Sequence, residues 1–297
     1  MKNKSLILSL FILFIITLLL PVSTAETVVC QIVDGSAFTT LQEALDEIET
    51  GETIKLLNHI EHQDTIEVSG ENINFDLNGY TLNVTVTTGD AIVVGSGGII
   101  SLDDSAGGEL NASGGIRGVY AHDGGEVTVT NAIRLVNGDY YGGENCAVYA
   151  ENHGKITVKK DTTGYSSSSF GAYAYNRGSI TVGGSCIGVY VGARANAYSS
   201  VLVEGNAIGA HRGSWATNNS TIEVQGDSIA TGSGNSAGAQ AEGDSTIIIY
   251  GDARGLTDGV TAEESSITIH GNCSATETYC GDGVTASLFS DVTIKGN

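Results

Sequence analysis

Residues 195–226 read ANAYSSVLVEGNAIGAHRGSWATNNSTIEVQG and contain one phrase twice. Each copy starts at an alanine, Ala195 or Ala216, and continues through polar residues to an apolar-any-apolar triplet and a glycine. An apolar spacing of two residues is the period of a β-strand, because successive side chains of a strand point to opposite faces. The stretch therefore predicts short strands that are joined by glycine turns and repeated at a fixed interval.

The same phrase returns along the chain at spacings of 29, 24, 21, 21, 25, 21 and 24 residues. Helical repeats need roughly 33 to 47 residues, so a shorter period built from β-branched strands is typical of a parallel β-helix. We therefore expect an all-β fold, a single-stranded parallel β-helix (solenoid) over residues 53–297. The repeated alanines are Ala121, Ala150, Ala174, Ala195, Ala216, Ala241, Ala262 and Ala286.

Each of these alanines precedes a pair of β-branched residues that we expect to face the interior. The pairs are Val127/Val129, Ile156/Val158, Ile180/Val182, Val201/Val203, Ile222/Val224, Ile247/Ile249, Ile267/Ile269 and Val292/Ile294. The amino-acid composition agrees with a β-solenoid. The 41 glycines can form tight turns, and the one proline, Pro21, lies outside the repeat, where it removes no hydrogen bond between strands.

The first 25 residues have the pattern of a secretory signal. Lys2 and Lys4 precede an apolar stretch from residue 6 to 20, and small residues lead to Ala25. We expect cleavage after Ala25 and a secreted or cell-surface protein without a membrane span. The alternative is an uncleaved anchor, although the apolar stretch is shorter than the ~20 residues that a membrane span needs.

The charge of the chain narrows the classes of partner. The formal net charge is −21, and it becomes about −23 once the two signal lysines are removed. A chain this acidic without a basic track is a poor nucleic-acid binder. Acidic polysaccharides or membranes would need bridging cations such as calcium. We therefore expect no nucleic-acid partner and no cofactor, with calcium kept as a candidate.

The five cysteines are treated first as thiols, with one candidate disulfide. Cys273 and Cys280 are close enough in sequence for a small loop disulfide in an oxidising compartment. Cys146 and Cys186 are more than one coil apart, so we do not expect them to pair.

Residues 26–52 are predicted to form an N-terminal cap that contains a short helix. Thr40 and Glu43 have the spacing of a capping box, and the helix should end near Gly51. Its predicted apolar face consists of Leu41, Ala44, Leu45 and Ile48. A solenoid needs such a lid, because its first coil otherwise exposes unpaired strand groups and apolar core.

The phrases TLQEALDEIETGETIKLL (40–57) and TIEVSGENINFDLNGYTL (65–82) resemble the N-terminal cap and first coils of pectate-lyase-like β-helix proteins of prokaryotes. The phrases DDSAGGEL (103–110) and GVYAHDGGEVTVTN (118–131) resemble coils of the same secreted or surface group. The resemblance implies a right-handed coil. It leaves activity open, because this fold hosts polysaccharide lyases, glycosidases and adhesins.

No catalytic or metal-binding residues are assigned from the sequence. The resemblance implies that lyases of this architecture use Asp clusters to hold calcium against a substrate carboxylate and an Arg or Lys to take a proton or stabilise the developing charge. The basic residues here fall at different phases of the coil and mark no single site. Asp227 and Asp252 recur in a turn that carries Asn206 and Asn272 in other coils. Repetition in every coil favours a stacked polar ladder over catalysis or calcium binding.

The residue before each repeated alanine provides the candidate ligand-binding site. In successive coils it is Tyr120, Tyr149, Tyr173, Arg194 and Trp215. Strand alternation predicts that this column points outward, with neighbours about 4.8 Å apart. Exposed rings and arginines suit stacking on sugars or docking to a protein. The alternative is that these residues stack between coils for stability.

The predicted function is a secreted or cell-surface, adhesin-like binding scaffold that recognises polysaccharide or a surface protein. The alternatives are an extracellular polysaccharide lyase or glycoside hydrolase, and a purely structural segment of a larger surface protein. The last strand, residues 291–294, has no predicted lid after it. We therefore expect either a fragment of a longer protein or end-to-end self-association.

Overall fold

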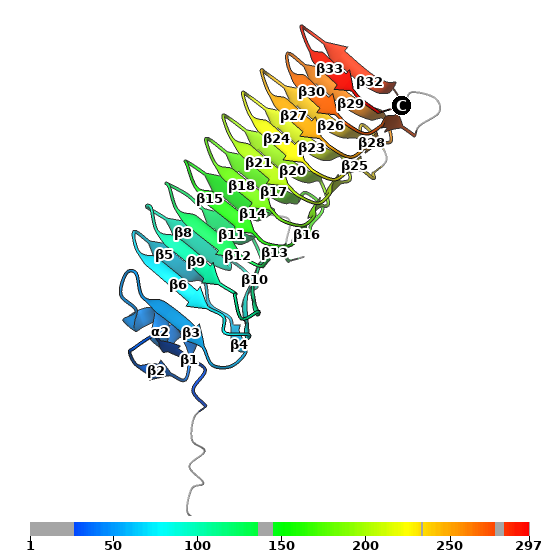
Figure 1. Cartoon of the computed structure of the whole chain (residues 1–297). Helices are drawn as coiled ribbons and strands as arrows, with labels where there is room; N and C mark the ends of the chain where they lie inside the picture. The colour runs from blue at the N-terminus through cyan, green and yellow to red at the C-terminus, as the bar shows by residue number, and fades with distance from the viewer. Residues whose placement is uncertain (1–26, 136–144, 233, 277–281, 297) are drawn as a thin grey trace, which may run out of the picture.

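The computed structural model describes residues 27–135, 145–232, 234–276 and 282–296. It confirms an all-β parallel solenoid whose strands lie across a long axis and stack into three sheets (Figure 1). The predicted signal, residues 1–25, lies outside the described residues. Within the described ranges, no helix is both long and apolar enough to cross a membrane.

Sheet A has 13 strands and contains most of the predicted inward pairs. In spatial order it consists of β2 (Ala37–Phe38), β1 (Cys30–Ile32), β3 (Thr53–Leu56), β6 (Asn72–Asp76), β9 (Ile99–Asp103), β12 (Glu126–Val129), β15 (Lys155–Val158), β18 (Ser179–Val182), β21 (Ser200–Val203), β24 (Thr221–Val224), β27 (Thr246–Ile249), β30 (Ser266–Ile269) and β33 (Asp291–Ile294). The pairings of β1 with β2 and with β3 are antiparallel, whereas the later pairings are parallel.

Sheet B has 10 strands, each at the start of a coil. They are β4 (Ile60–His62), β7 (Thr81–Val86), β10 (Glu109–Gly114), β13 (Asn131–Arg134), β16 (Thr162–Gly164), β19 (Cys186–Gly188), β22 (Ala207–Gly209), β25 (Ser228–Ala230), β28 (Ala253–Gly255) and β31 (Cys273–Ala275).

Sheet C also has 10 strands, and it carries the repeated alanines. They are β5 (Ile66–Ser69), β8 (Ile92–Gly95), β11 (Arg117–Ala121), β14 (Cys146–Glu151), β17 (Phe170–Tyr175), β20 (Val191–Asn196), β23 (Arg212–Thr217), β26 (Ala237–Glu242), β29 (Asp258–Glu263) and β32 (Asp282–Ser287).

The predicted repeat is confirmed residue by residue. The eight alanines pair with one another in order from Ala121 to Ala286. The inward pairs are also in register along sheet A, and those from Val127 to Ile269 are at most 3% exposed. One β-branched or alanine side chain per position in each coil therefore builds a continuous apolar core along the axis.

Helix α2 (Leu41–Glu47) begins at the predicted capping box. The Thr40 side chain accepts a hydrogen bond from the Glu43 backbone, and the Glu43 side chain accepts one from the Thr40 backbone. Leu41 and Ala44 are buried against the core. The helix lies at the N-terminal end of the stack, beside β1 and β2 (Figure 1). Its role as a lid remains a prediction.

Two kinds of polar ladder hold the corners of the coil. Backbone N–H groups of buried serines donate to serine hydroxyls one coil further along, from Ser199 through Ser220, Ser245 and Ser265 to Ser290. A second ladder lies on the first strands of sheet B and continues in the turns just before its later strands. It runs through Glu61, Asn83, Asn111, Asn131, Asp161, Ser185, Asn206, Asp227, Asp252 and Asn272. The stacked ladder predicted for the Gly-Asp turns is therefore confirmed, because turn side chains satisfy backbone groups that the corners leave unpaired.

Candidate functional site

The predicted ligand-binding residues form one continuous column on sheet C. Tyr120, Tyr149, Tyr173, Arg194 and Trp215 occupy equivalent positions in successive coils. We call these five residues the aromatic–arginine column. Their alignment follows from the register of the inward alanines beside them, so the sequence located the column correctly.

The rings of the column stack on one another along the axis of the solenoid. The Tyr120 and Tyr149 ring centroids are 5.6 Å apart with an interplanar angle of 18°, and those of Tyr149 and Tyr173 are 5.2 Å apart. The first pair is stacked, whereas the second is tilted by 49°, so the facing sides of Tyr120 and Tyr149 are covered by each other. Stacking of a sugar on these tyrosine faces would have to displace the existing ring contacts.

Arginines continue the stack around the indole of Trp215. The guanidinium carbon of Arg194 is 5.1 Å from the Tyr173 ring centroid and 3.8 Å from that of Trp215. The guanidinium carbon of Arg212 is 4.7 Å from the Trp215 centroid, and its Nε donates to Gln240 in the following coil. Cation–π contacts of this kind contribute about 0.5–2 kcal/mol each.

The predicted exposure of the column is wrong for two of its rings. Tyr149 is 3% exposed and Tyr173 is 9% exposed. They belong to a second apolar cluster, outside the main core, with Cys146, Phe170 and Val191. Strict alternation along β14, β17 and β20 would turn these three side chains inward, but they pack against the rings instead and cover them.

The Trp215 end of the column is only partly covered, and two of its polar groups lack an acceptor. Arg194 and Trp215 are partly exposed. Within the described part of the chain, Nε of Arg194 and Nε1 of Trp215 are shielded from solvent and have no hydrogen-bond partner. An unpaired buried donor costs about 1–3 kcal/mol. Cation–π stacking is therefore obtained here at the expense of hydrogen bonding.

The first coil of the column is held by ion pairs and hydrogen bonds. Arg117 stacks 3.7 Å above the Tyr120 ring and forms a bidentate contact with Asp90 at 2.9 and 2.8 Å. Glu151 accepts hydrogen bonds from the hydroxyls of Tyr120 and Tyr149. These contacts fix the side chains in place and use the polar groups that a ligand would need.

A second candidate surface, which the sequence analysis did not identify, lies on the outer face of sheet B. A groove of about 470 Å³ crosses β4, β7, β10, β13 and β16. We call it the amide groove, because the Asn ladder runs along it. Its lining residues are Glu61, Asn83, Thr85, Asn111, Ser113, Asn131, Ile133, Asp161 and Thr163.

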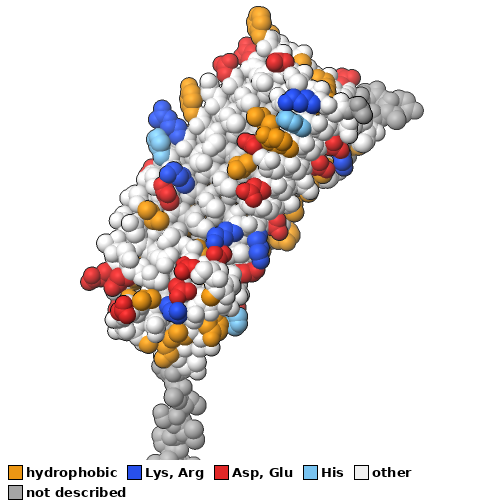
Figure 2. Space-filling view, viewed as in Figure 1, with side chains coloured by type: hydrophobic (Ala, Val, Ile, Leu, Met, Phe, Trp, Pro, Cys, Tyr) orange, Lys and Arg blue, Asp and Glu red, His pale blue; other side chains and the backbone are white. Residues whose placement is uncertain are grey.

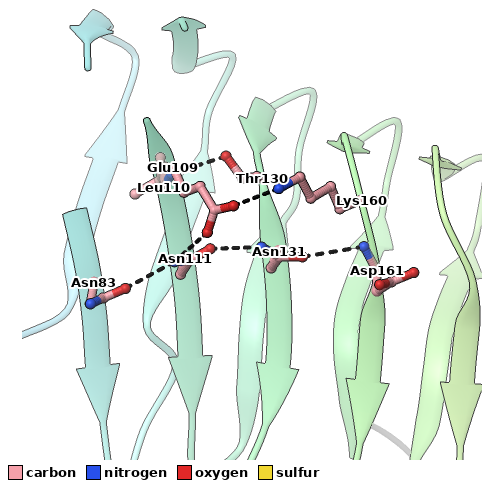
Figure 3. A network of polar contacts seen from close by, with 8 residues as sticks. All are labelled: Asn83, Glu109, Leu110, Asn111, Thr130, Asn131, Lys160 and Asp161. Carbon is pink, nitrogen blue, oxygen red and sulfur yellow. Dashed lines mark hydrogen bonds and ion pairs between the residues drawn. The ribbon is translucent and has the colours of Figure 1, made fainter. Parts of the chain in front are cut away.

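The amides of the groove are linked from coil to coil (Figure 3). Nδ2 of Asn111 donates to Oδ1 of Asn83 at 2.9 Å, and Nδ2 of Asn131 donates to Oδ1 of Asn111 at 2.8 Å. Asn83 in turn donates to Glu61 at 2.7 Å. A side-chain amide has two N–H donors. Within the described residues, Asn83 and Asn131 therefore each retain one N–H group for a ligand.

Charged residues close one border of the groove. Lys160 donates to Glu109, and Asn111 donates to the same carboxylate at 3.3 Å. These hydrogen bonds, that from Lys160 first, lower the pKa of Glu109 below its ordinary value. Elsewhere, on the side seen in Figure 2, charged side chains occur singly or in small groups among uncharged ones. The groove itself contains Glu61 and Asp161 and no cation.

Among the described residues, no group of three or more His, Cys, Asp or Glu side chains is placed to hold a metal ion.

Cys280 lies outside the described residues, so its pairing with Cys273 stays a prediction. Burial raises the pKa of the Cys186 thiol to about 12 and that of Cys273 to about 11.

Comparison with known proteins finds no matching family model, no similar curated protein and no similar solved structure. The parallel solenoid is thus established by the structure, whereas the resemblance to pectate-lyase-like proteins rests on the quoted sequence phrases alone.

Proposed function

We propose that this protein is a binding scaffold, secreted or held at the cell surface, and that it binds an uncharged polysaccharide along the amide groove. The observation that supports this most strongly is the composition of the groove. Side-chain amides line three successive coils about 4.8 Å apart, at Asn83, Asn111 and Asn131. The groove also contains the hydroxyls of Thr85, Ser113 and Thr163. A polysaccharide also presents hydroxyl donors and acceptors at a regular interval along an extended chain.

The charge of the groove favours an uncharged ligand. Glu61 and Asp161 line it, and the whole chain has a formal net charge of −21. An acidic polysaccharide would be repelled at short range by these two carboxylates and at longer range by the net charge. A neutral sugar avoids both penalties and can accept from the remaining N–H groups of Asn83 and Asn131.

A ligand on the aromatic–arginine column stays the second candidate. The partly exposed Trp215 favours it, because Trp and Arg are common at the centre of binding surfaces. The stacked ring faces limit such a ligand to edge contacts with the rings and polar contacts with the guanidinium groups.

The experiment is binding of a panel of neutral and acidic oligosaccharides to the wild-type protein and to two matched variants. Ser113→Tyr places a large side chain in the groove, whereas Thr181→Tyr places the same side chain on the outer face of sheet A. We expect Ser113→Tyr to weaken binding of a neutral oligosaccharide at least tenfold and Thr181→Tyr to leave it unchanged. Equal binding by both variants, with unchanged melting, would move the site away from the groove.

A further inference from the structure

An apolar stripe follows the amide groove on the outer face of sheet B. Strands β16, β19, β22 and β25 have three residues each, and only the middle residue of each strand is not buried. In β19, β22 and β25 that residue is Ile187, Ile208 and Ile229. All three are partly exposed, and the register places them side by side in successive coils. We call these three residues the isoleucine stripe.

The groove and the isoleucine stripe share one row of outward positions. Ser113 is in register with Ile133, and Ile133 with Thr163, and all three line the groove. Thr163 is in turn in register with Ile187, the first residue of the stripe. A ligand that follows the groove from coil to coil therefore reaches the stripe without a change of direction.

The isoleucines lie outside the apolar core. Within the described residues, none of the three belongs to the main core or to the second apolar cluster. Single apolar side chains are normal on a protein surface, whereas several that adjoin one another mark sites of interaction. The same row carries Thr163 before the stripe and Arg254 after it, so isoleucine is not a general feature of this face.

Polar residues border the stripe on one side and at its far end. The residues directly before the three strands belong to the polar ladder and are partly exposed; they are Ser185, Asn206 and Asp227. Arg254 is in register with Ile229 and pairs with Asp227 at 3.3 Å, which closes the row. The distance from Thr163 to Arg254 is four coil steps, or about 19 Å.

The other side of the stripe is a corner of the coil. Val189 directly follows β19 and is 40% exposed, and Ala210 directly follows β22 and is partly exposed. The apolar track is therefore one or two residues wide along its whole length. A stable protein interface buries about 800 Å² on each partner, which a track this narrow does not offer. An extended alkyl chain, in contrast, is narrow and apolar throughout.

We infer that the ligand is a glycolipid, with neutral sugars in the amide groove and an alkyl chain along the isoleucine stripe. This inference rests on the proposed function, because it names the class of sugar conjugate that the same site binds. The alkyl chain adds affinity because its surface and that of the isoleucines leave water together. Carbons beyond Arg254 meet charged groups, so the gain should level off once the chain spans the track.

The test compares the methyl and the octyl glycoside of each neutral oligosaccharide in the panel, below the concentration at which the octyl glycoside forms micelles. We expect the octyl glycoside to bind the wild type at least about tenfold more tightly, because a few buried CH2 groups suffice for that factor. In the double variant Ile187→Thr with Ile208→Thr, this advantage should be lost, whereas the methyl glycoside keeps its wild-type affinity. Threonine is β-branched like isoleucine and suits a strand.

A matched control makes the same substitution on another face. Ile248→Thr alters the outer face of sheet A and should preserve the octyl advantage. Equal binding of both glycosides to the wild type would overturn the inference and leave the proposed function intact. An octyl advantage that survives in the double variant would also overturn it, as would a wild-type dimer that the double variant dissociates, since the stripe would then face a second copy. Absence of binding by every glycoside would overturn the proposed function as well.

Discussion

The guanidinium carbon of Arg194 lies 3.8 Å from the centroid of the Trp215 ring, one coil away. The same guanidinium is 5.1 Å from Tyr173, so the cation is enclosed between two aromatic rings. We expect Arg194→Ala to lower the free energy of unfolding by about 1–2 kcal/mol, because both cation–π contacts are lost. Urea denaturation measures this change. Arg177→Ala, at an exposed turn, serves as the control, and an equal loss there would argue against the ring contacts.

Tyr149 is the most deeply buried ring of the column. Because it is 3% exposed and packs with Phe170, Tyr149→Ala should lower the free energy of unfolding by about 3–5 kcal/mol, as for other large-to-alanine changes in a core. Tyr198, which is 65% exposed, is the matched control, and Tyr198→Ala should change stability by less than about 1 kcal/mol. A Tyr149→Ala protein that melts like the wild type would show that the second apolar cluster is dispensable.

The central amide of the groove should be structural as well as functional. Asn111 donates to Asn83 and Glu109 and accepts from Asn131, so Asn111→Ala removes three hydrogen bonds. We expect a loss of about 1–3 kcal/mol in the free energy of unfolding. The control is Asn72→Ala in β6, where the exposed side chain has no hydrogen-bond partner among the described residues. Similar melting of both variants would contradict the ladder's contribution.

His62 should make stability depend on pH. Its imidazole is buried, and burial lowers the pKa below 6.5 in the folded state. The unfolded chain therefore takes up a proton first as the pH falls, so the stability due to neutral His62 is complete above pH 6.5 and declines as the pH drops toward the folded pKa. His62→Leu should abolish this component. The measurement is the wild-type minus variant difference in melting temperature between pH 8 and pH 5, and a constant difference would contradict the assignment.

The repeat made most of the fold predictable. A pair such as Ile222 and Val224 indicates both the two-residue period of a strand and the face that points inward. The spacing between Ala216 and the equivalent alanines of other coils gives the length of a coil. The antiparallel pairing of β1 with β3 was not predictable in this way, because Cys30–Ile32 has no counterpart in later coils. Its partner depends on tertiary packing at the first coil.

The candidate sites were predictable only in part. The positions of Tyr149 and Tyr173 followed from the repeat, but their burial did not, because strict alternation would turn the covering side chains of Phe170 and Val191 to the interior. The sequence analysis did not identify the amide groove. Asn83 and Asn111 come before the first repeated alanine, Ala121, and the residues around Asn131 differ from those around the other two asparagines. Asn83 and Asn111 each end a triplet of a polar residue, leucine and asparagine, at residues 81–83 and 109–111. This repeated triplet was the signal in the sequence that could have located the groove.

The most direct measurement of the proposed function is a crystal structure of the protein with the neutral oligosaccharide that binds best in the panel. The expected result is a sugar chain in the amide groove, with hydroxyls accepting from Asn83 and Asn131 and the Ser113 side chain beneath it. A bound sugar that contacts Trp215 and leaves the groove empty would contradict the assignment and favour the aromatic–arginine column instead.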